Sequence, residues 1–246
     1  MDKTAIYDTL NRAYFSADAH EKDVLERLPT LLRNNSLLVD VGASLGQYTR
    51  AMCQAVRNSD LYAIEADPIR VEQLKRNCQE WGRGSTNKLA VLHMALTDHT
   101  GEASFFVTNS DVSGSLTPHR TPRPVEWEEI TIPSSTLDQL FPERCPDFIK
   151  IDVEGAELAV LRGAKRILAQ NDTIFLIELH DWPSGSHRAN EVRRLMQSAG
   201  YASVSFFGQP LFVKSRRLWL TLKLMELRDA RRLLRRLQAR LKWRVR

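Results

Sequence analysis

Residues 37–46 read Leu-Leu-Val-Asp-Val-Gly-Ala-Ser-Leu-Gly. The first five are apolar apart from Asp40, as in a short buried strand, and the run stops at Gly42. The residues that follow, 47–57, have the spacing of a helix. A strand that passes through a glycine turn into a helix is the repeating unit of α/β proteins, so the chain is expected to belong to that class.

The alternation of short apolar runs and helical segments continues along the chain. Asp67 is expected to cap one helix and Pro68 to begin it, because an aspartate oxygen accepts free N–H groups and proline already has a helical φ. Near the end, residues 208–210 join two strands as a hairpin, so a mostly parallel sheet is expected to finish antiparallel. Strands are expected at 37–42, 61–65, 90–96, 147–153, 173–179, 203–207 and 211–214, and helices at 47–57, 67–81, 157–169 and 188–198.

Residues 98–146 interrupt this alternation. A further strand is expected at 103–107 and a short one at 130–132, separated by residues 110–124, which are rich in serine, threonine and proline. A long polar insertion beside a rigid sheet forms either a lid or substrate loop, or a surface excursion without function. The sequence leaves both interpretations open.

The composition is that of a globular protein, with 43% hydrophobic residues and a mean hydropathy of −0.34. No run approaches the roughly 20 apolar residues that cross a bilayer. The first residues are charged and lack an apolar core, so no signal peptide is expected. Cys53, Cys78 and Cys145 lie far apart without metal-binding spacing, which favours a reducing compartment and therefore a cytoplasmic protein.

The net charge of +5 combines two unlike parts. Residues 216–246 hold 12 of the 35 basic residues and 2 of the 30 acidic ones, so the rest of the chain is mildly acidic. An acidic body does not favour a nucleic-acid-binding protein. We therefore predict three parts, which are an N-terminal helical segment (1–35), an α/β domain (36–215) and a basic C-terminal helix (216–246).

Acids and glycines at the ends of the first two strands predict a cofactor site. Gly42 and Gly46 let a ligand approach the backbone at the carboxyl edge of the sheet, where doubly wound folds bind ligands. No GxGxxG motif is present, so the turn is poorly suited to bind the pyrophosphate of a dinucleotide. Asp40 could hold an ammonium group, and Glu65 stands where an acid binds a ribose diol. An amine, an uncharged linker and a ribose together describe S-adenosylmethionine.

The same turn also matches the G-x-S-x-G pattern of a hydrolase, which would make Ser44 a nucleophile. Such a turn lies well inside its sheet, after several strands, whereas no strand is expected before residue 37. Asp40 would also place a negative charge beside the nucleophile. The hydrolase is therefore the weaker interpretation.

Several blocks of the sequence resemble FkbM-type S-adenosylmethionine-dependent methyltransferases, over about residues 36–214. The most specific block is FIKIDVEGAELAVLRGA at 148–164. The resemblance implies a seven-stranded class I, Rossmann-like sheet and methylation of hydroxyl oxygens, often on sugars or polyketide-like natural products. The other blocks are VDVGASLGQYT (39–49), IEADPIRVEQLKRN (64–77), ALTDHTGEASFFV (95–107), STLDQL (135–140) and IELH (177–180).

The resemblance also implies which residues contact the cofactor. The methionine part of the cofactor would be flanked by Asp40, Gly42, Ala43 and Gly46. Its ribose would be bound by Glu65, and its adenine would lie near Ala66 and Ala95.

Methyl transfer to a hydroxyl needs a proton acceptor, and candidates lie at the ends of two strands. Lys150, Asp152 and Glu154 alternate along one strand and therefore share a face. Glu178 and His180 do the same on the next strand, so Lys150 is expected to pair with Glu178. We predict Asp152, Glu154 and His180 as the catalytic residues, with His180 as the base because histidine titrates near neutral pH.

Other interpretations of these residues stay open. His180 could be a structural histidine, and Glu154 could have no role beyond shaping the turn into the next helix. Glu157 could have no role beyond stabilising the N-terminus of that helix. Asp152, Glu154, Glu178 and His180 could together bind a divalent ion that acidifies the hydroxyl, although nothing in the sequence requires a metal.

The sequence thus predicts a methyltransferase that uses S-adenosylmethionine and acts on a hydroxyl of a sugar, a glycan or a related metabolite. One alternative is a methyltransferase whose small-molecule acceptor is a nitrogen or a carboxylate. The other is an inactive methyltransferase-like module that serves an assembly through its tail.

The tail, residues 216–246, carries leucines every seven residues from Leu220 to Leu241, beside many basic residues. Such an amphipathic helix either packs on the domain with a solvated basic face or binds an anionic membrane, here the inner face. Trp219 and Trp243 would suit the membrane surface. Nucleic acid or an acidic partner is less favoured.

Overall fold

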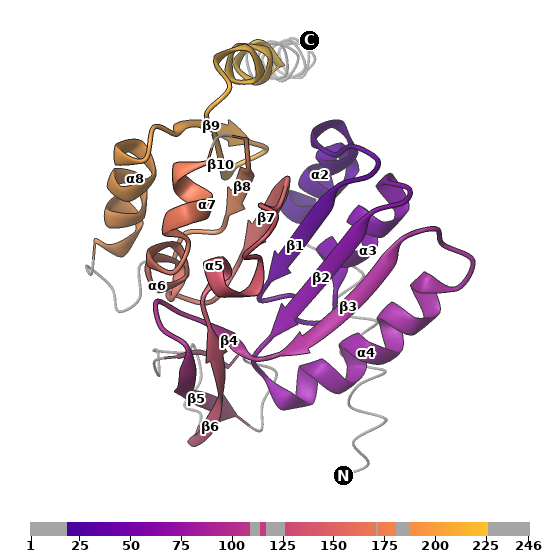
Figure 1. Cartoon of the computed structure of the whole chain (residues 1–246), viewed down its shortest axis with the longest axis vertical. Helices are drawn as coiled ribbons and strands as arrows, with labels where there is room; N and C mark the ends of the chain where they lie inside the picture. The colour runs from indigo at the N-terminus through magenta and orange to yellow at the C-terminus, as the bar shows by residue number, and fades with distance from the viewer. Residues whose placement is uncertain (1–18, 109–113, 117–125, 171, 181–186, 226–246) are drawn as a thin grey trace, which may run out of the picture.

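The computed structural model describes residues 19–108, 114–116, 126–170, 172–180 and 187–225 (Figure 1). These residues form a large central sheet between helices, and a small second sheet. The first elements are α2 (Ala19–Arg27), η1 (Leu28–Leu31), β1 (Leu37–Val41), α3 (Gln47–Ala55), β2 (Asp60–Glu65), α4 (Pro68–Gly82), β3 (Lys88–His93), β4 (Ala95–Leu96), β5 (Gly101–Thr108) and β6 (Trp127–Ser135). The others are α5 (Leu137–Leu140), β7 (Phe148–Ile151), α6 (Glu157–Arg162), α7 (Lys165–Ala169), β8 (Ile174–Ile177), α8 (Arg188–Ser198), β9 (Ala202–Phe206) and β10 (Gln209–Val213).

The central sheet has seven strands in the order β3-β2-β1-β7-β8-β10-β9. Neighbouring strands run parallel from β3 through β8, whereas β10 is antiparallel to both β8 and β9. The predicted seven-stranded, mostly parallel sheet with a terminal antiparallel hairpin is therefore confirmed. The strand order reverses between β1 and β7, and sheets of this kind bind ligands at such a switch point.

β1 is buried on both faces, which explains its nearly continuous apolar sequence. Leu37, Val39 and Val41 pack in a cluster with residues of α6, α7 and α8. Leu38 packs on the opposite face with residues of α2, η1 and α3. Because alternate residues of a strand point the same way, Asp40 lies on the α3 side of the sheet.

The apolar run at 90–96 forms two strands instead of the single strand expected. β3 ends at His93, which is in register with Glu65 at the end of β2. Ala95 and Leu96 then form β4, which belongs to the small sheet β4-β6-β5. The chain leaves the central sheet where its neighbour β2 ends, so the pairing partner and not the apolar pattern sets the strand boundary.

The insertion at 98–146 carries most of the small sheet. β5 pairs antiparallel with β6 along the whole length of β5, and both strands exceed those expected at 103–107 and 130–132. The small sheet lies at the carboxyl edge of the central sheet (Figure 1). Of the expected loop at 110–124, the structure describes only residues 114–116. Within them, Ser115 forms an antiparallel bridge with Phe106 of β5.

The helix expected at 157–169 is broken into α6 and α7 at Gly163. A β-carbon at Gly163 would lie 2.2 Å from the carbonyl oxygen of Thr97, so only glycine fits there. The carboxylate of Asp138 accepts N–H groups in the first turn of α7 and starts that helix anew. Contacts with residues distant in the sequence thus override the local helical pattern.

The hairpin turn between β9 and β10 lies at Phe207 and Gly208, whereas 208–210 was expected. Both residues have positive φ, 51° and 95°, as the favoured two-residue hairpin turn requires. Gln209 instead begins β10.

The described parts of the two flanking segments pack against the central sheet. Val24 of α2 is fully buried in the cluster beside α3. Residues 216–225 are helical, and Leu222 is buried in the same cluster. Trp219 holds this helix by donating its indole N–H to the carbonyl of Ser203 at 3.2 Å.

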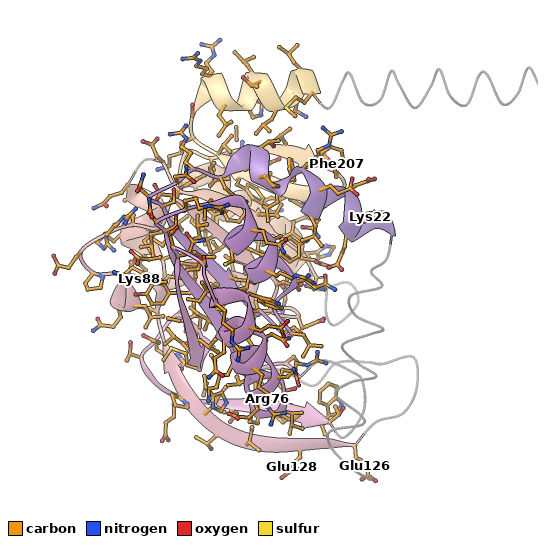
Figure 2. All side chains as sticks on the ribbon, turned by 90° about the vertical axis from the view of Figure 1, so that its right-hand side faces the viewer. Lys22, Arg76, Lys88, Glu126, Glu128 and Phe207 are labelled. Carbon is orange, nitrogen blue, oxygen red and sulfur yellow. The ribbon has the colours of Figure 1, made fainter. Side chains whose placement is uncertain are left out.

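In Figure 2 this helix and α2 lie at the same end of the molecule, near Phe207. The remainder of the predicted flanking segments, residues 1–18 and 226–246, lies outside the described residues. Among the helices that are described, none is both long and apolar enough to cross a membrane.

Candidate active site

A cavity opens at the carboxyl edge of β1 and β2, where the cofactor is predicted to bind. It encloses about 680 Å³, counting its open mouth, which is within the range of small-molecule sites. Asp152 and Glu154, two of the predicted catalytic residues, lie on its wall. Its lining includes four of the predicted cofactor residues, namely Gly42, Glu65, Ala66 and Ala95.

Glu65 is buried at the end of β2, and backbone groups hold its carboxylate. Oε1 accepts the N–H groups of Ala66 and Asp67, both at 2.8 Å, and Oε2 accepts the N–H of Ser44 at 2.7 Å. An ionised carboxylate has about four acceptor positions, so Oε2 keeps one for a ligand. Burial raises the pKa of Glu65, against the opposing effect of these hydrogen bonds and of Arg70. A carboxylate fixed in this way suits a ribose hydroxyl.

Arg70 lines the cavity, and sequence reasoning missed it. Its Nη1 donates to Oγ of Ser44 at 2.7 Å, and its Nε lies 3.5 Å from Oδ2 of Asp67. Ser44 has a φ of 50°, a left-handed conformation that residues other than glycine seldom adopt. The one signal for Arg70 is its place in the first turn of α4, a turn after the Asp67 cap. The hydrolase interpretation needs a general base such as an imidazole at Ser44, where the structure places a guanidinium.

The two glycines after β1 make close contacts with the protein itself. A β-carbon at Gly42 would lie 1.7 Å from the carbonyl oxygen of Asp152. One at Gly46 would lie 2.7 Å from Leu74 and 2.8 Å from Trp81. Gly42 therefore lets β1 end close against β7, and Gly46 lets α3 pack on α4. Approach to a ligand is thus not the only reason for glycine at these positions.

Asp40, Ala43 and Gly46 are not part of the cavity lining. Asp40 is buried, and Thr49 donates its hydroxyl to Oδ2 at 2.6 Å. Burial raises the pKa of Asp40 to about 6, although this hydrogen bond and Lys150 act to lower it. Ala43 packs in an apolar cluster against α4. Contact of these three residues with the methionine part of the cofactor stays a prediction.

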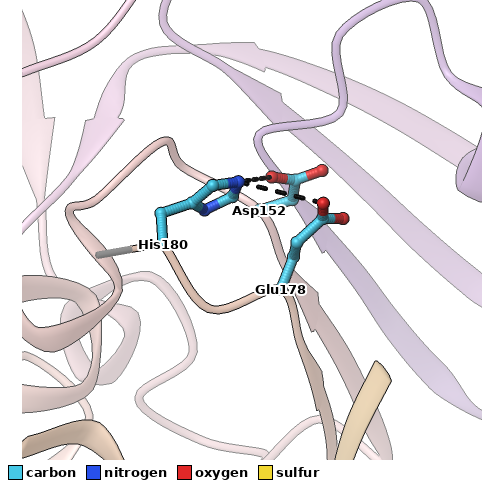
Figure 3. A group of neighbouring side chains, drawn as sticks. All are labelled: Asp152, Glu178 and His180. Atoms are coloured by element: carbon cyan, nitrogen blue, oxygen red, sulfur yellow. Dashed lines mark ion pairs between the residues drawn. The ribbon is translucent and has the colours of Figure 1, made fainter. Parts of the chain in front are cut away.

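The ends of β7 and β8 bring the predicted catalytic residues together with Glu178. Figure 3 shows Asp152, Glu178 and His180 of this cluster. Nε2 of His180 lies 3.9 Å from Oδ1 of Asp152, 3.7 Å from Oε2 of Glu154 and 3.8 Å from Oε1 of Glu178. Asp152 and Glu154 belong to this cluster and to the cofactor cavity. A ligand in the cavity therefore reaches the cluster directly.

Lys150 lies beneath the cluster with none of its side chain exposed. Its Nζ is 3.5 Å from Oδ2 of Asp152 and 3.5 Å from Oε2 of Glu178, so the expected pair is present. The ammonium also lies 4.7 Å from the ring centre of Tyr48. Burial lowers the pKa of Lys150, but the carboxylates around it raise it more, and the net shift is upward. Lys150 thus stays charged and holds one oxygen of each acid, while the other oxygen faces His180.

Glu157, the first residue of α6, holds His180 from the other side. Its side chain is 1% exposed, and Oε1 accepts the Nδ1–H of His180 at 2.9 Å and the N–H of Gly155 at 2.9 Å. When Nδ1 donates to a buried carboxylate, Nε2 is the acceptor of the neutral ring. The sequence suggests only a helix N-terminus for Glu157, whereas the structure places it behind the predicted base.

The pKa of His180 is raised to about 9. Burial lowers it, but the hydrogen bond to Glu157 and the charges of Glu154 and Asp152 raise it more. His180 is therefore mostly protonated at neutral pH before a ligand binds. A positive charge placed nearby lowers a histidine pKa, so a cationic cofactor would favour the neutral ring.

Glu154 and Gly155 turn the chain from β7 into α6 with φ values of 51° and 97°. A left-handed φ at a non-glycine residue costs on the order of 1 kcal/mol and is common at functional sites. Burial raises the pKa of Glu154, and the charge of His180 opposes this. Glu154 therefore shapes the turn and also faces the cluster, so the two roles considered for it are compatible.

The same cluster has the spacing for a divalent ion. One atom each from Asp152, Glu178 and His180 lies within 4.8 Å of the other two. Carboxylate oxygens and an imidazole nitrogen are ordinary ligands of Mg²⁺, Mn²⁺ or Zn²⁺. Lys150 already provides one positive charge to both acids. Direct proton transfer to His180 and activation by a metal therefore remain two alternatives for experiment.

The fold agrees with a comparison to known families. A family model described as the methyltransferase FkbM domain matches residues 40–203. The chain belongs to this family. FkbM membership and the class I sheet imply the use of S-adenosylmethionine. The charges and hydrogen-bond acceptors of the cavity fit that cofactor, because Glu65, Asp152 and Glu154 outnumber Arg70 around a ligand that carries positive charge.

Two curated proteins are similar to this FkbM chain. The hexuronic acid methyltransferase AglP of Haloferax volcanii is 25% identical over 160 residues, which cover 65% of this chain and 62% of that protein. The 2-O-methyltransferase NoeI of Sinorhizobium fredii is 24% identical over 160 residues, covering 59% of this chain and 64% of that protein. Each match spans less than two thirds of the relative's length.

Among solved structures, the crystal structure of the methyltransferase FkbM from Methylobacillus flagellatus has a similar fold. The TM-score is 0.50 and the identity is 18%, over 74% of this chain and 44% of that one. At this level of identity the similarity supports the fold alone. It agrees with the strand order observed here.

Proposed function

We propose that this protein is an O-methyltransferase that moves the methyl group of S-adenosylmethionine to a hydroxyl of a sugar, a glycan or a related metabolite. The observation that carries the proposal is the His180 imidazole beside the cofactor cavity. Its Nδ1 is held by the buried Glu157 and its Nε2 faces the acids that line the cavity. A proton acceptor in this place is what a hydroxyl acceptor needs and a more basic amine acceptor does not.

The names of the relatives support a sugar as the acceptor. One is called a hexuronic acid methyltransferase and the other a 2-O-methyltransferase. Both names fit a site that combines a cofactor cavity with a base. We infer from this that the acceptor carries several hydroxyls, of which one reaches His180.

The residues of this chain would divide the work as follows. S-adenosylmethionine, when bound, supplies a methyl group on a sulfonium. Glu65 would hold the ribose, and the wall formed by Asp152 and Glu154 would place the acceptor hydroxyl near the cofactor. His180 would take the hydroxyl proton at Nε2, and Glu157 would stabilise the imidazolium at Nδ1. Proximity and alignment supply much of the rate increase in such a transfer.

The experiment that tests the proposal uses S-adenosylmethionine with a deuterated methyl group and a panel of sugars. We expect a product with the mass of one labelled methyl group, stable to mild base, because an ether survives conditions that hydrolyse a methyl ester. A labelled amine or ester would support the alternative acceptors. Failure to bind the cofactor would support the alternative of an inactive methyltransferase-like module. If EDTA abolishes transfer and Mg²⁺ restores it, the metal alternative replaces His180 as the group that activates the hydroxyl.

Substituting Glu157 tests the role of the residue behind the base. The rate of methyl transfer at subsaturating substrate concentration should rise with pH up to about 9, the pKa of His180, because the protonated ring accepts no proton. Glu157→Gln removes a charge that raises this pKa, so the rising limb should move to lower pH and the plateau should fall. Asp152, Glu154 and Glu178 still face the ring in this variant, and Lys150 still lies behind Asp152 and Glu178.

The measurement is a pH–rate profile of the wild type, Glu157→Gln and Glu157→Asp. The aspartate variant keeps the charge and should keep most of the alkaline position of the limb. A glutamine variant with lower activity but an unmoved limb would show that Glu157 acts only in folding.

Contact of residues 216–246 with the inner face of an anionic membrane stays a prediction. In favour of it, Leu220 and Leu224 are 46% and 58% exposed, on a helix that also carries Arg216 and Lys223. Leu222 is buried against the domain, which agrees with the alternative of a packed helix.

A further inference from the structure

A second cavity adjoins the cofactor cavity and shares Leu116 and Glu154 with it. It encloses about 840 Å³ by the same measure, which is ample for a sugar. Part of its wall is apolar, from Leu116, Ala156, Leu158 and Ala159. The C–H faces of a sugar ring pack well on such a surface. The shared residues place this cavity next to the catalytic acids.

Two arginines line the second cavity, one from each of two neighbouring helices. Arg162 ends α6, on the same face as Leu158 and Ala159, because residues three and four apart lie above one another on a helix. Arg188 begins α8, and its Nη1 donates to the carbonyl of Gly155 at 3.1 Å. That hydrogen bond fixes Arg188 to the turn that carries Glu154.

The two guanidinium groups form no ion pair within the part of the chain that the structure describes. Among the described residues, no carboxylate lies within 4.0 Å of the charged nitrogens of Arg162 or Arg188. Glu154 and Glu191 line the same cavity, but they form no such pair with either arginine. Guanidinium groups bind carboxylates and phosphates through two parallel hydrogen bonds. The pair of arginines therefore fits an anionic group at this position.

We propose that the second cavity is the acceptor subsite and that Arg162 and Arg188 select a sugar that carries a negative charge. The anionic oxygens come from a carboxylate on the sugar or from a phosphate on it, and both have the chemistry that arginine recognises. The apolar wall supports the ring, and the hydroxyl reaches the acids through Glu154. This inference rests on the proposed methyl transfer to a sugar hydroxyl.

Binding of small probes to the full chain loaded with S-adenosylhomocysteine tests the proposal by calorimetry. The probes are a methyl glucuronoside, glucose 1-phosphate and the neutral methyl glucoside. We expect one of the acidic probes to bind roughly 10-fold tighter than the neutral one or better, as hydrogen bonds to charged groups imply. The acidic probe that binds tighter identifies the source of the charge. Equal binding of the neutral sugar, or binding of none of the three, overturns the proposal.

Arg162→Gln/Arg188→Gln should abolish the preference for the acidic probe. The matched control is Arg193→Gln, an exposed arginine on α8 that is not part of the cavity lining and should leave the preference unchanged. The cofactor affinity of each variant shows whether it is folded. A double variant that binds the cofactor and keeps the preference also overturns the proposal.

Transfer of a labelled methyl group separates this inference from the proposed function. If the wild type methylates the neutral glucoside as well as it does the acidic sugars, the inference fails and the function stands. If it methylates no sugar but modifies an amine or a carboxylate, the proposed function itself fails.

Discussion

Replacing His180 by glutamine is expected to lower the rate of methyl transfer roughly 10²–10⁴-fold, the usual contribution of a general base. Glutamine keeps a group that can hydrogen-bond to Glu157 but accepts no proton at neutral pH. Because His180 does not line the cofactor cavity, the affinity for S-adenosylmethionine should change little. The measurements are single-turnover methyl transfer and calorimetric titration with the cofactor.

His99→Gln is the matched control for this variant. His99 is largely exposed and pairs with Asp98 at 3.0 Å, away from the cluster, so its loss should leave the rate unchanged. A His180→Gln variant that binds cofactor and keeps the wild-type rate would assign the proton to Asp152, Glu154 or water. That result would remove the observation on which the proposed function depends.

Loss of the Glu65 carboxylate is expected to weaken binding of S-adenosylmethionine. Charge-assisted hydrogen bonds to the ribose are worth about 1.5–3 kcal/mol, which corresponds to a fall in affinity of about 10- to 150-fold. Glu65→Gln is preferable to alanine, because its carbonyl oxygen still accepts one of the backbone N–H groups that hold the turn at Ala66 and Asp67. The measurement is a titration with S-adenosylhomocysteine.

The 2′-deoxy form of the same ligand shows whether the loss comes from the ribose. Removal of the hydroxyl should weaken binding to the wild type and have little further effect on Glu65→Gln. If the two changes weaken binding independently, Glu65 only supports the turn and the ribose binds elsewhere.

Local sequence patterns were sufficient where each element is defined by its own residues. The buried run of β1, the Asp67 cap of α4 and the alternation that places Lys150 beside Asp152 and Glu178 were all predictable. These features depend on strand periodicity and on hydrogen bonds within one turn of the chain.

The sequence did not predict the features that depend on contacts between residues far apart in the chain. At the break between α6 and α7, Gly163 lies against the carbonyl of Thr97 and Asp138 caps the new helix, and both partners are far away in the chain. The end of β3 is set by the length of β2, not by the apolar run that continues to Leu96. A pattern over a short window of the sequence does not show that Thr97 will lie against Gly163 or that β2 will pair with β3.

The missed site residues share one cause. The direction of Glu157 toward His180 depends on the left-handed turn at Glu154 and Gly155, which no periodicity predicts. Arg70 resembles any charged residue on a helix until the fold places it beside Ser44. By contrast, the acids that follow strands were found because a strand fixes the direction of its side chains.

In the proposed reaction, Glu65 and His180 lie at the two ends of one site. A crystal structure of the full chain with S-adenosylhomocysteine and an acceptor sugar would show whether they do. We expect the ribose hydroxyls on the Glu65 carboxylate and one acceptor oxygen within about 3 Å of Nε2 of His180, on the side where the cofactor sulfur lies. A cofactor bound away from Glu65, or an acceptor oxygen that no hydrogen bond or single water connects to His180, would contradict it.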